Sequence, residues 1–202
     1  STAAKSFSHQ IGVSQLASAH TLVFGGYSGE SAAIGTGTLS FAFGTWASDE
    51  SFSANSDRTA VDVTISSANA TLAGLRDTIN DADLQVTASI IRTDDTNYAL
   101  ALKSREGASH SLQISATENP SGSGLSSLAY TSVDNSIQSV AGANSTLTLD
   151  GVSITRQSNL IDDLVDGVSM TLNSTTSQNG TITATYDGST ALTAMKTLVD
   201  EI

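Results

Sequence analysis

VDVTISSANATLAGLRDTINDADLQVTAS, residues 61–89, is the stretch of sequence that decides the fold. It opens with apolar residues at every second position, the period of a half-buried strand, and continues with apolar residues at helical spacing. The strand set is Val61, Val63 and Ile65, and the helix set is Leu72, Leu75 and Ile79. The stretch therefore predicts a strand followed by a short amphipathic helix.

The predicted helix is about three turns long, which is too short to be stable alone in water. Asn69 or Thr71 is placed to cap it by accepting a hydrogen bond from an early amide. The helix must therefore lie on a sheet. Two further alternating sets flank the turn RTDDTN: Val86, Ala88 and Ile90 before it, and Tyr98, Leu100 and Leu102 after it. The predicted order is strand, helix, then hairpin.

TLTLDGVSITRQSNLIDDLVDGVSMTL, residues 146–172, predicts a second unit that begins with a hairpin. Its Asp150-Gly151 pair suits a two-residue turn in which both central residues have positive φ. Such a turn sets the register, and the pairs across it are Leu149 with Val152 and Leu147 with Ile154. All four apolar side chains then share one face of the hairpin.

A second short helix is predicted to start at Ser158 or Asn159, because apolar residues follow at positions that fit one helix face. These residues are Leu160, Ile161, Leu164 and Val165. Gly167 is placed to end the helix in a left-handed conformation. Next come a strand with Val168, Met170 and Leu172, a turn at Asn179-Gly180, and a strand with Ile182, Ala184 and Tyr186.

Three segments resemble the family of flagellar filament cap proteins, flagellar hook-associated protein 2. TLAGLRDTIN…VTASI is similar to the helix–strand motif of flagellar hook-associated proteins, with its Ile79-Asn80 pair. LTLDGVSITRQSNLIDDLVDGVSMTL resembles the family's Asp-Gly-Val hairpin, Ser-Asn start, short helix and Gly-Val strand. IGVSQLASAHTL, residues 11–22, is similar to the segment where the family enters its head. The segments follow the family's order, whereas residues 27–57 match nothing in its pattern.

The resemblance implies an α+β, β-rich fold of two lobes of mainly antiparallel sheet with short packed helices, the outer lobe inserted in the inner one. Residues 1–33 and 133–188 would form the inner head domain, and residues 34–132 the outer head domain. Residues 189–202 would begin a leg helix, truncated here, so the chain is expected to be the head of a larger subunit. The apolar stripe of this helix is Ala191, Leu192, Met195, Leu198, Val199 and Ile202.

The resemblance also implies a function. Family members cap the distal end of the bacterial flagellar filament and promote flagellin folding and polymerisation during assembly. The implied location is extracellular, at the tip of the flagellum, after export by the flagellar type III system. The implied partners are other copies of the subunit in a homo-oligomeric ring, flagellin, hook–filament junction proteins and an export chaperone. No catalytic residue, metal site or cofactor is expected in such a structural protein.

The charge of the chain argues against nucleic acid as a partner. Twenty acidic and eight basic residues give a formal net charge of −12, and the basic residues are scattered along the sequence. Phosphate binding needs clustered Lys and Arg. No apolar run approaches the roughly 20 residues that cross a membrane. The absence of cysteine argues against a disulfide scaffold and is compatible with export of an unfolded chain.

The residues that could carry chemistry favour structural interpretations. His9, His20 and His110 lack metal-ligand spacing, and there is no cysteine to assist them. Asp162, Asp163 and Asp166 cluster on the second predicted helix, where a calcium site is the functional alternative and solvated acids near a helix N-terminus are the simpler one. For TDDTN, residues 93–97, a hairpin loop is the preferred interpretation, and a metal-binding loop is the alternative.

Two further features leave alternatives open. The Asn-x-Ser/Thr triplets at Asn69, Asn144, Asn173 and Asn179 are expected by chance in a chain so rich in Ser and Thr. Trp46 is either an exposed contact residue or buried under the outer lobe.

An adhesin-like head that binds host mucin or glycans is the alternative function. An extracellular hydrolase would need a nucleophile–base pair that the sequence does not supply.

Overall fold

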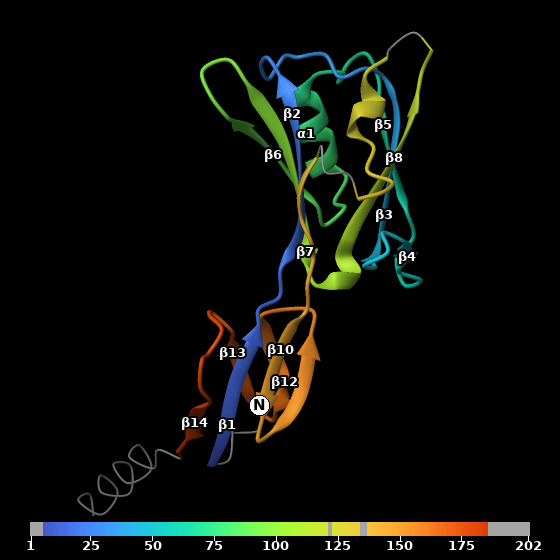
Figure 1. The fold of residues 1–202 in the computed structure, drawn as a ribbon. Helices are drawn as coiled ribbons and strands as arrows, with labels where there is room; N and C mark the ends of the chain where they lie inside the picture. The colour runs from blue at the N-terminus through green and yellow to red at the C-terminus, as the bar shows by residue number, and fades with distance from the viewer. Residues whose placement is uncertain (1–5, 121–122, 134–136, 186–202) are drawn as a thin grey trace, which may run out of the picture.

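The computed structural model describes residues 6–120, 123–133 and 137–185, and these form two lobes joined at a narrow waist (Figure 1). The larger lobe holds the long central part of the chain. Its elements are β2 (Ala19–Tyr27), β3 (Gly37–Trp46), β4 (Phe52–Ala54), β5 (Val61–Ile65), α1 (Leu72–Asp81), β6 (Thr87–Arg92), β7 (Tyr98–Glu106), the 3₁₀ turns η1 (Ala108–His110) and η2 (Leu125–Leu128), β8 (Ser111–Glu118) and β9 (Gln138–Val140).

Two antiparallel sheets make up the larger lobe. One has the strand order β6-β7-β2-β9. In the other, β3 is central: β8 pairs with one edge of β3, and β5 and β4 pair one after the other with its opposite edge. The predicted strand at residues 61–65 and the predicted hairpin around residues 92–97 are both confirmed.

Helix α1 closes the larger lobe, as its apolar spacing predicts. Leu72, Leu75 and Ile79 are fully buried between the sheets. Of the two predicted caps, Thr71 holds the position, since its side chain accepts a bond from the Gly74 amide. Asn80 then fastens the helix to β6 by bonding both the N–H and the C=O of Ala88, at 2.8 and 3.0 Å. The Ile79-Asn80 pair thus combines one core side chain with one backbone clamp.

Trp46 packs against the core of the larger lobe, so the buried alternative is the better description. Its indole Nε1 donates to the carbonyl of Leu112 at 2.9 Å. Its ring centroid lies 4.9 Å from that of Phe52 and 5.5 Å from that of Tyr130. An indole that is half-buried and hydrogen-bonded to backbone in this way is a structural residue.

The smaller lobe is assembled from both ends of the described chain. Its elements are β1 (Phe7–Gln15), β10 (Ser145–Leu149), β11 (Val152–Arg156), β12 (Leu160–Val165), β13 (Val168–Thr171) and β14 (Gly180–Ala184). Four strands form a sheet in the order β11-β10-β1-β14, and β12 and β13 form a separate hairpin. Val13, Leu147, Ile161 and Leu172 are its buried hydrophobic cluster.

The hairpin predicted at Asp150-Gly151 is confirmed with its register. Leu149 pairs with Val152, and Leu147 pairs with Ile154. Asp150 has φ 48° and Gly151 has φ 85°, which are the two positive values that the predicted turn requires. Leu147 is fully buried, whereas Val152, next to the turn, is 63% exposed.

The helix predicted from residue 158 is wrong, because residues 160–165 form strand β12, paired with β13. The apolar residues at 160, 161, 164 and 165 fit one face of a helix, but Ile161 alone among them is buried. Gly167 does have the expected left-handed conformation, with φ 76°, but it turns a hairpin and does not end a helix. A short apolar run cannot separate helix from strand by spacing alone.

The turn predicted at Asn179-Gly180 is also wrong. Gly180 lacks a positive φ and begins β14, where it pairs with Ile11 of β1. The strand predicted after it is confirmed through Ala184. Tyr186 and the predicted leg helix at 189–202 lie outside the described residues.

The larger lobe is inserted between β1 and β10 of the smaller lobe, as expected for the family-like arrangement. The expected domain boundaries at 33/34 and 132/133, however, differ from the limits of the lobes that the strand pairing defines. β2 and β9 lie outside residues 34–132, yet they pair with each other inside the larger lobe. The chain crosses between the lobes at residues 16–18 and 141–144, so strand pairing moves both boundaries to the waist.

Candidate functional site

The waist is a polar junction where the two crossing segments are paired. The Ser18 amide donates to the carbonyl of Ala143 at 2.9 Å, and the Ala143 amide donates to the carbonyl of Ser18 at 3.0 Å. The Gly107 amide donates to the same Ser18 carbonyl at 3.1 Å. Backbone hydrogen bonds therefore join both crossings to the end of β7, and they limit how freely one lobe can turn against the other.

Asn159 is the centre of this junction. Its side-chain oxygen accepts from the Ala17 amide at 2.8 Å, and its Nδ2 donates to the Ala17 carbonyl at 2.9 Å. Its own amide and Nδ2 also donate to the two carboxylate oxygens of Glu106, at 3.0 and 3.1 Å. One side chain of the smaller lobe thus holds a crossing segment and the last residue of β7 together.

Sequence reasoning placed Asn159 at a helix start and missed this role. Both interpretations use the ability of an asparagine side chain to satisfy backbone groups, so residue type did not distinguish them. The available signal was the Ser-Asn pair in the resemblance. Its partners, Ala17 and Glu106, are more than fifty positions away in the sequence.

A second polar contact holds the far end of the smaller lobe. Asp150, in the hairpin turn, accepts from His9 Nδ1 at 2.6 Å and from the Gln10 amide at 2.8 Å. These bonds, first that of His9 and then that of the Gln10 amide, lower the pKa of the Asp150 carboxyl. The hairpin tip is thereby fixed to β1, and His9 has a structural partner.

The other two histidines also have hydrogen-bond partners. His20 is 2% exposed, and its Nδ1 accepts from the Leu112 amide at 2.9 Å. Burial lowers the pKa of His20 to about 4, so the side chain is neutral at physiological pH. His110 Nδ1 lies 2.5 Å from the carbonyl oxygen of Glu106. The structure therefore places the three histidines at separate sites.

The predicted acidic cluster does not form. Asp162, Asp163 and Asp166 lie on or beside a strand and not on a helix, and Asp163 pairs with Arg156 at 2.9 Å. Within residues 6–120, 123–133 and 137–185, no group of three or more His, Asp or Glu could hold a metal ion. In the same residues, no helix is long and apolar enough to cross a membrane.

Two of the four Asn-x-Ser/Thr asparagines have structural roles. Asn69 accepts from the Ser66 amide at 2.7 Å and donates to Thr78 at 2.8 Å. Asn144 accepts from the Ala108 amide at 2.8 Å, next to the waist. Both side chains are already engaged by the fold.

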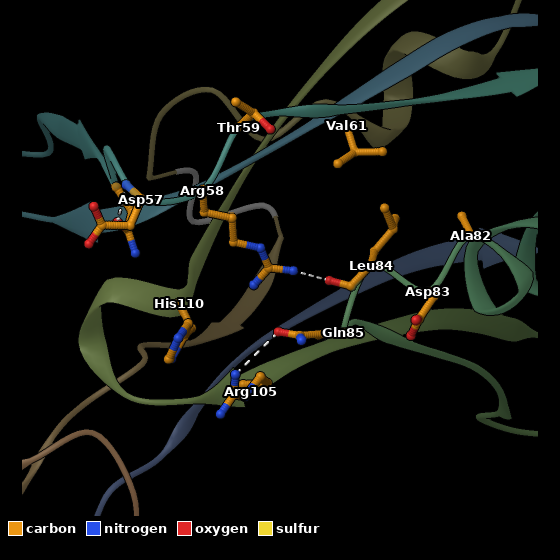
Figure 2. A pocket seen from close by; sticks show the side chains of 11 residues that line it. Asp57, Arg58, Thr59, Val61, Ala82, Asp83, Leu84, Gln85, Arg105 and His110 are labelled. Carbon is orange, nitrogen blue, oxygen red and sulfur yellow. Dashed lines mark hydrogen bonds between the residues drawn. The ribbon is translucent and has the colours of Figure 1, made fainter.

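A cavity lies on the larger lobe, between the loop before β5 and the segment that links α1 to β6 (Figure 2). Its volume is about 540 Å³, and Arg58, Arg105 and His110 are among the residues that line it. Figure 2 shows Arg58 reaching across the cavity to the carbonyl of Leu84, to which it donates. Arg105 donates to Gln85 at 3.3 Å.

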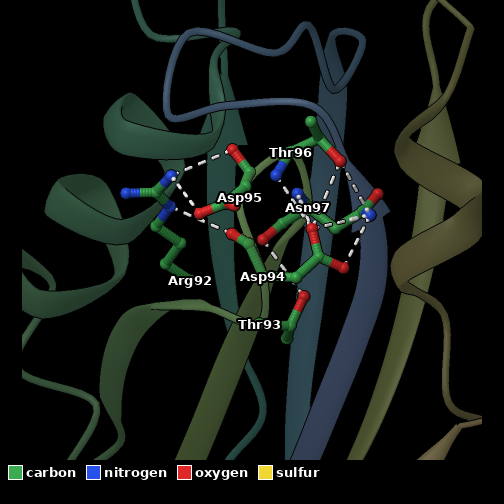
Figure 3. Close-up of polar contacts among 6 residues, drawn as sticks. All are labelled: Arg92, Thr93, Asp94, Asp95, Thr96 and Asn97. Carbon is green, nitrogen blue, oxygen red and sulfur yellow. Dashed lines mark hydrogen bonds and ion pairs between the residues drawn. The ribbon is translucent and has the colours of Figure 1, made fainter.

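The loop at the tip of the β6–β7 hairpin is organised by one carboxylate (Figure 3). Asp94 accepts from the amides of Thr96 and Asn97, at 2.8 and 2.9 Å, and also from the side chain of each. These bonds lower the pKa of Asp94. Arg92 reaches back to Asp95 at 3.3 Å. The TDDTN segment is therefore an ordered hairpin loop, as predicted.

Comparison with known proteins identifies relatives over most of the chain. The family model for the C-terminus of flagellar hook-associated protein 2 matches residues 142–201. Flagellar hook-associated protein 2 of Salmonella typhimurium is 29% identical over 69% of this chain and 30% of its own length. The B-type flagellar hook-associated protein 2 of Pseudomonas aeruginosa is 35% identical over 61% of this chain and 28% of its own length. The chain spans less than a third of these relatives.

Solved structures match nearly the whole chain. The D2–D3 domains of the flagellar cap protein FliD from Escherichia coli superpose with a TM-score of 0.77 at 29% identity, covering 93% of this chain and 91% of that one. FliD from Pseudomonas aeruginosa PAO1 superposes with a TM-score of 0.76 at 27% identity, covering 99% and 89%. The resemblance drawn from the sequence is confirmed, and the chain belongs to the flagellar hook-associated protein 2 family, the flagellar cap proteins.

Proposed function

We propose that the protein containing this chain is a structural component of the flagellar filament cap. It would cap the distal end of the filament and promote the folding and polymerisation of flagellin during assembly. The observation that carries the proposal is the match to the D2–D3 domains of a flagellar cap protein over 93% of this chain and 91% of that one. A likeness of this extent covers both lobes and the waist between them.

The proposed mechanism is steric and involves no bond chemistry. The lobes would form part of a plate above the growing end, under which exported flagellin is retained until it has folded. Such a plate needs a fixed angle between its parts. The waist bonds of Asn159 and Ser18 support this requirement, because they tie both chain crossings to the end of β7. Absence of enzymatic activity is part of the proposal.

The proposed partners are further copies of the subunit in a ring, together with flagellin, the hook–filament junction proteins and an export chaperone. The proposed location is outside the cell, at the flagellar tip, after passage through the flagellar type III apparatus. The net charge of −12 supports solubility after export, and the absence of cysteine means that no disulfide would have to be broken for it. None of the relatives named above is described as an adhesin, and nothing favours the glycan-binding alternative.

The proposal is tested in a motile strain of the source organism from which the full-length gene has been deleted. The deletion strain is expected to release unpolymerised flagellin into the medium and to lack filaments. The full-length subunit should restore both filaments and motility, and a version lacking residues 19–140 should not. Normal filaments in the deletion strain would overturn the proposal.

A further inference from the structure

Within the part of the chain that the structure describes, two arginines of the larger lobe form no ion pair. Arg76 pairs with Asp77, Arg92 with Asp95 and Arg156 with Asp163. Among the described residues, no ion pair involves Arg58 or Arg105, and both line the same cavity. Acidic residues outnumber basic ones by twenty to eight in this chain, so two unpaired arginines at one cavity call for an explanation.

The two guanidinium groups repel each other across the cavity. Arg58 lies over the ring of Phe43, 3.3 Å from its centroid, which takes part of its charge out of water. The pKa of Arg58 is lowered, first by this burial and then by the charge of Arg105. Asp57 and Asp83 also line the cavity, but neither forms an ion pair with an arginine there. A carboxylate entering from outside would offset both the burial and the repulsion.

The chain carries an acidic projection of matching chemistry. Figure 1 shows the β6–β7 hairpin tip standing clear of the rest of the larger lobe. The Asp95 side chain is fully exposed there, at 103%, so its contact with Arg92 is a surface ion pair of little strength. Asp94 holds the loop in one shape, so little conformational entropy would be lost when the loop is bound.

The projection and the cavity lie at opposite ends of one hairpin. β6 begins two residues after Gln85, which lines the cavity, and ends at Arg92, beside the loop. β7 runs back from Tyr98 to the cavity residue Arg105. Six strand residues place the two features roughly 20 Å apart. An acidic loop at one end and a cavity that holds Arg58 and Arg105 at the other would form a heterologous contact between copies, which closes into a ring when the rotation between copies permits.

We infer that the cavity at Arg58 and Arg105 receives the acidic loop 93–97 of a second copy of this chain. Asp95 of the incoming loop lies between the two guanidinium groups, and its bond to Arg92 is exchanged for bonds to Arg105 and Arg58. The inference rests on the proposed function, since it supplies the contact between neighbouring subunits in a cap. Its chemistry is a charge-assisted, bidentate pairing of carboxylate and arginine.

The absence of cysteine allows a direct test in this chain. Thr96, in the loop, and Thr59, on the cavity rim, are exposed, and replacing both with cysteine leaves every charge in place. Mild oxidation at tens of micromolar protein should give an intermolecular ladder of disulfide-linked oligomers. The salt is held at about 0.15 M, where the net charge is screened beyond roughly 8 Å but contacting charges still attract. The control pair, Thr96→Cys with Val152→Cys, places the second thiol on the smaller lobe and should give no ladder.

Charge reversal identifies the groups responsible. Arg105→Glu should slow ladder formation at least fivefold, and adding Asp95→Lys should restore it. Lys103→Glu makes the same charge change on the same strand without lining the cavity, and should leave the rate within twofold. No ladder, an equal ladder in the Val152→Cys control, or equal loss with Lys103→Glu would each overturn the inference.

The outcome is separable from that of the proposed function. If the disulfide-linked ladder forms but the full-length protein fails to restore filaments, the contact between copies is supported and the proposed cap function is rejected. If filaments are restored but no ladder forms, the cap function is supported and this contact is rejected. Citrate is the free carboxylate probe. If citrate stabilises the protein, Arg105→Glu abolishes that stabilisation and no ladder forms, the cavity binds another carboxylate, and the inference that a second copy occupies it is overturned.

Discussion

The two lobes are stabilised in different ways. The larger lobe buries a hydrophobic cluster that runs through both of its sheets and α1, including Phe41 and Phe43. The smaller lobe buries a much smaller cluster around Leu147, and polar contacts hold its two ends: Asn159 at the waist and Asp150 at the hairpin tip. The comparison indicates that the larger lobe is stable through its own core, whereas the smaller lobe depends on polar contacts at its two ends.

The largest expected effect is on the core of the larger lobe. Phe41 is fully buried on β3, so Phe41→Ala should lower the free energy of unfolding of this lobe by about 3–5 kcal/mol. Urea unfolding followed by Trp46 fluorescence reports on this lobe directly. Val61→Ala, at a 38% exposed position on neighbouring β5, is the control and should cost far less. Equal effects would show that the cluster is not the main source of stability.

The next effect concerns the waist. Asn159→Ala leaves the Ala17 amide and carbonyl and the Glu106 carboxylate without their partner, which should cost about 3 kcal/mol. The loss should appear in the smaller lobe and the waist, as faster amide hydrogen exchange there with little change in β3 and β8. Asn173→Ala, at an exposed position of the smaller lobe, is the control. Unchanged exchange in Asn159→Ala would mean that the junction does not hold the lobes together.

A pH dependence between pH 6.5 and pH 4 is expected from His20 in the larger lobe. The pKa of His20 is about 4 in the folded protein and close to 6.5 in the unfolded chain, which therefore binds a proton first as the pH falls. The free energy of unfolding should drop by about 3 kcal/mol between pH 6.5 and pH 4. Below pH 4, His20 should cause no further loss of stability, because it is then protonated in both the folded and the unfolded state. His20→Asn can keep the acceptor for the Leu112 amide and should flatten this slope, whereas His110→Asn should retain it. Parallel slopes in urea titrations would contradict the assignment.

The smallest effect is at the hairpin tip of the smaller lobe. Gly151 has φ 85° and open space around its Cβ position, so Gly151→Val should cost roughly 1–3 kcal/mol through backbone strain alone. Gly180 also faces open space but has an ordinary φ, and Gly180→Val in β14 should be nearly neutral. Thermal unfolding of the two variants distinguishes the real turn from the wrongly predicted one. Similar melting temperatures would remove the turn as a source of stability.

The difference in core size between the two lobes explains which elements could be predicted from the sequence. Helix α1 was predicted correctly because its three apolar residues bury against a large core, where spacing decides the structure. Residues 160–165 were predicted wrongly because only Ile161 is buried, and the pairing with β13 decides the conformation. Asp150-Gly151 was predicted correctly because a two-residue turn has local chemistry. The role of Asn159 could not be predicted, since its partners are distant in sequence.

The arginine cavity could not be predicted for a related reason. Arg58 and Arg105 are 47 positions apart in the sequence, and nothing local indicates that the loop before β5 and strand β7 bring them to one cavity. The acidic loop was recognised, but only as a hairpin loop. Charge counts gave the excess of acidic residues and no information about which arginines would remain unpaired.

The most direct test of the difference between the lobes is amide hydrogen exchange on the intact chain, read residue by residue. Strands β3, β7 and β8 of the larger lobe should exchange only through global unfolding. Strands β10, β11 and β12 of the smaller lobe should exchange through a local opening of clearly lower free energy, by at least about 1.4 kcal/mol or tenfold in rate. Equal protection in both lobes would contradict the account, since it would show that the smaller lobe is as stable as the larger one without a comparable core.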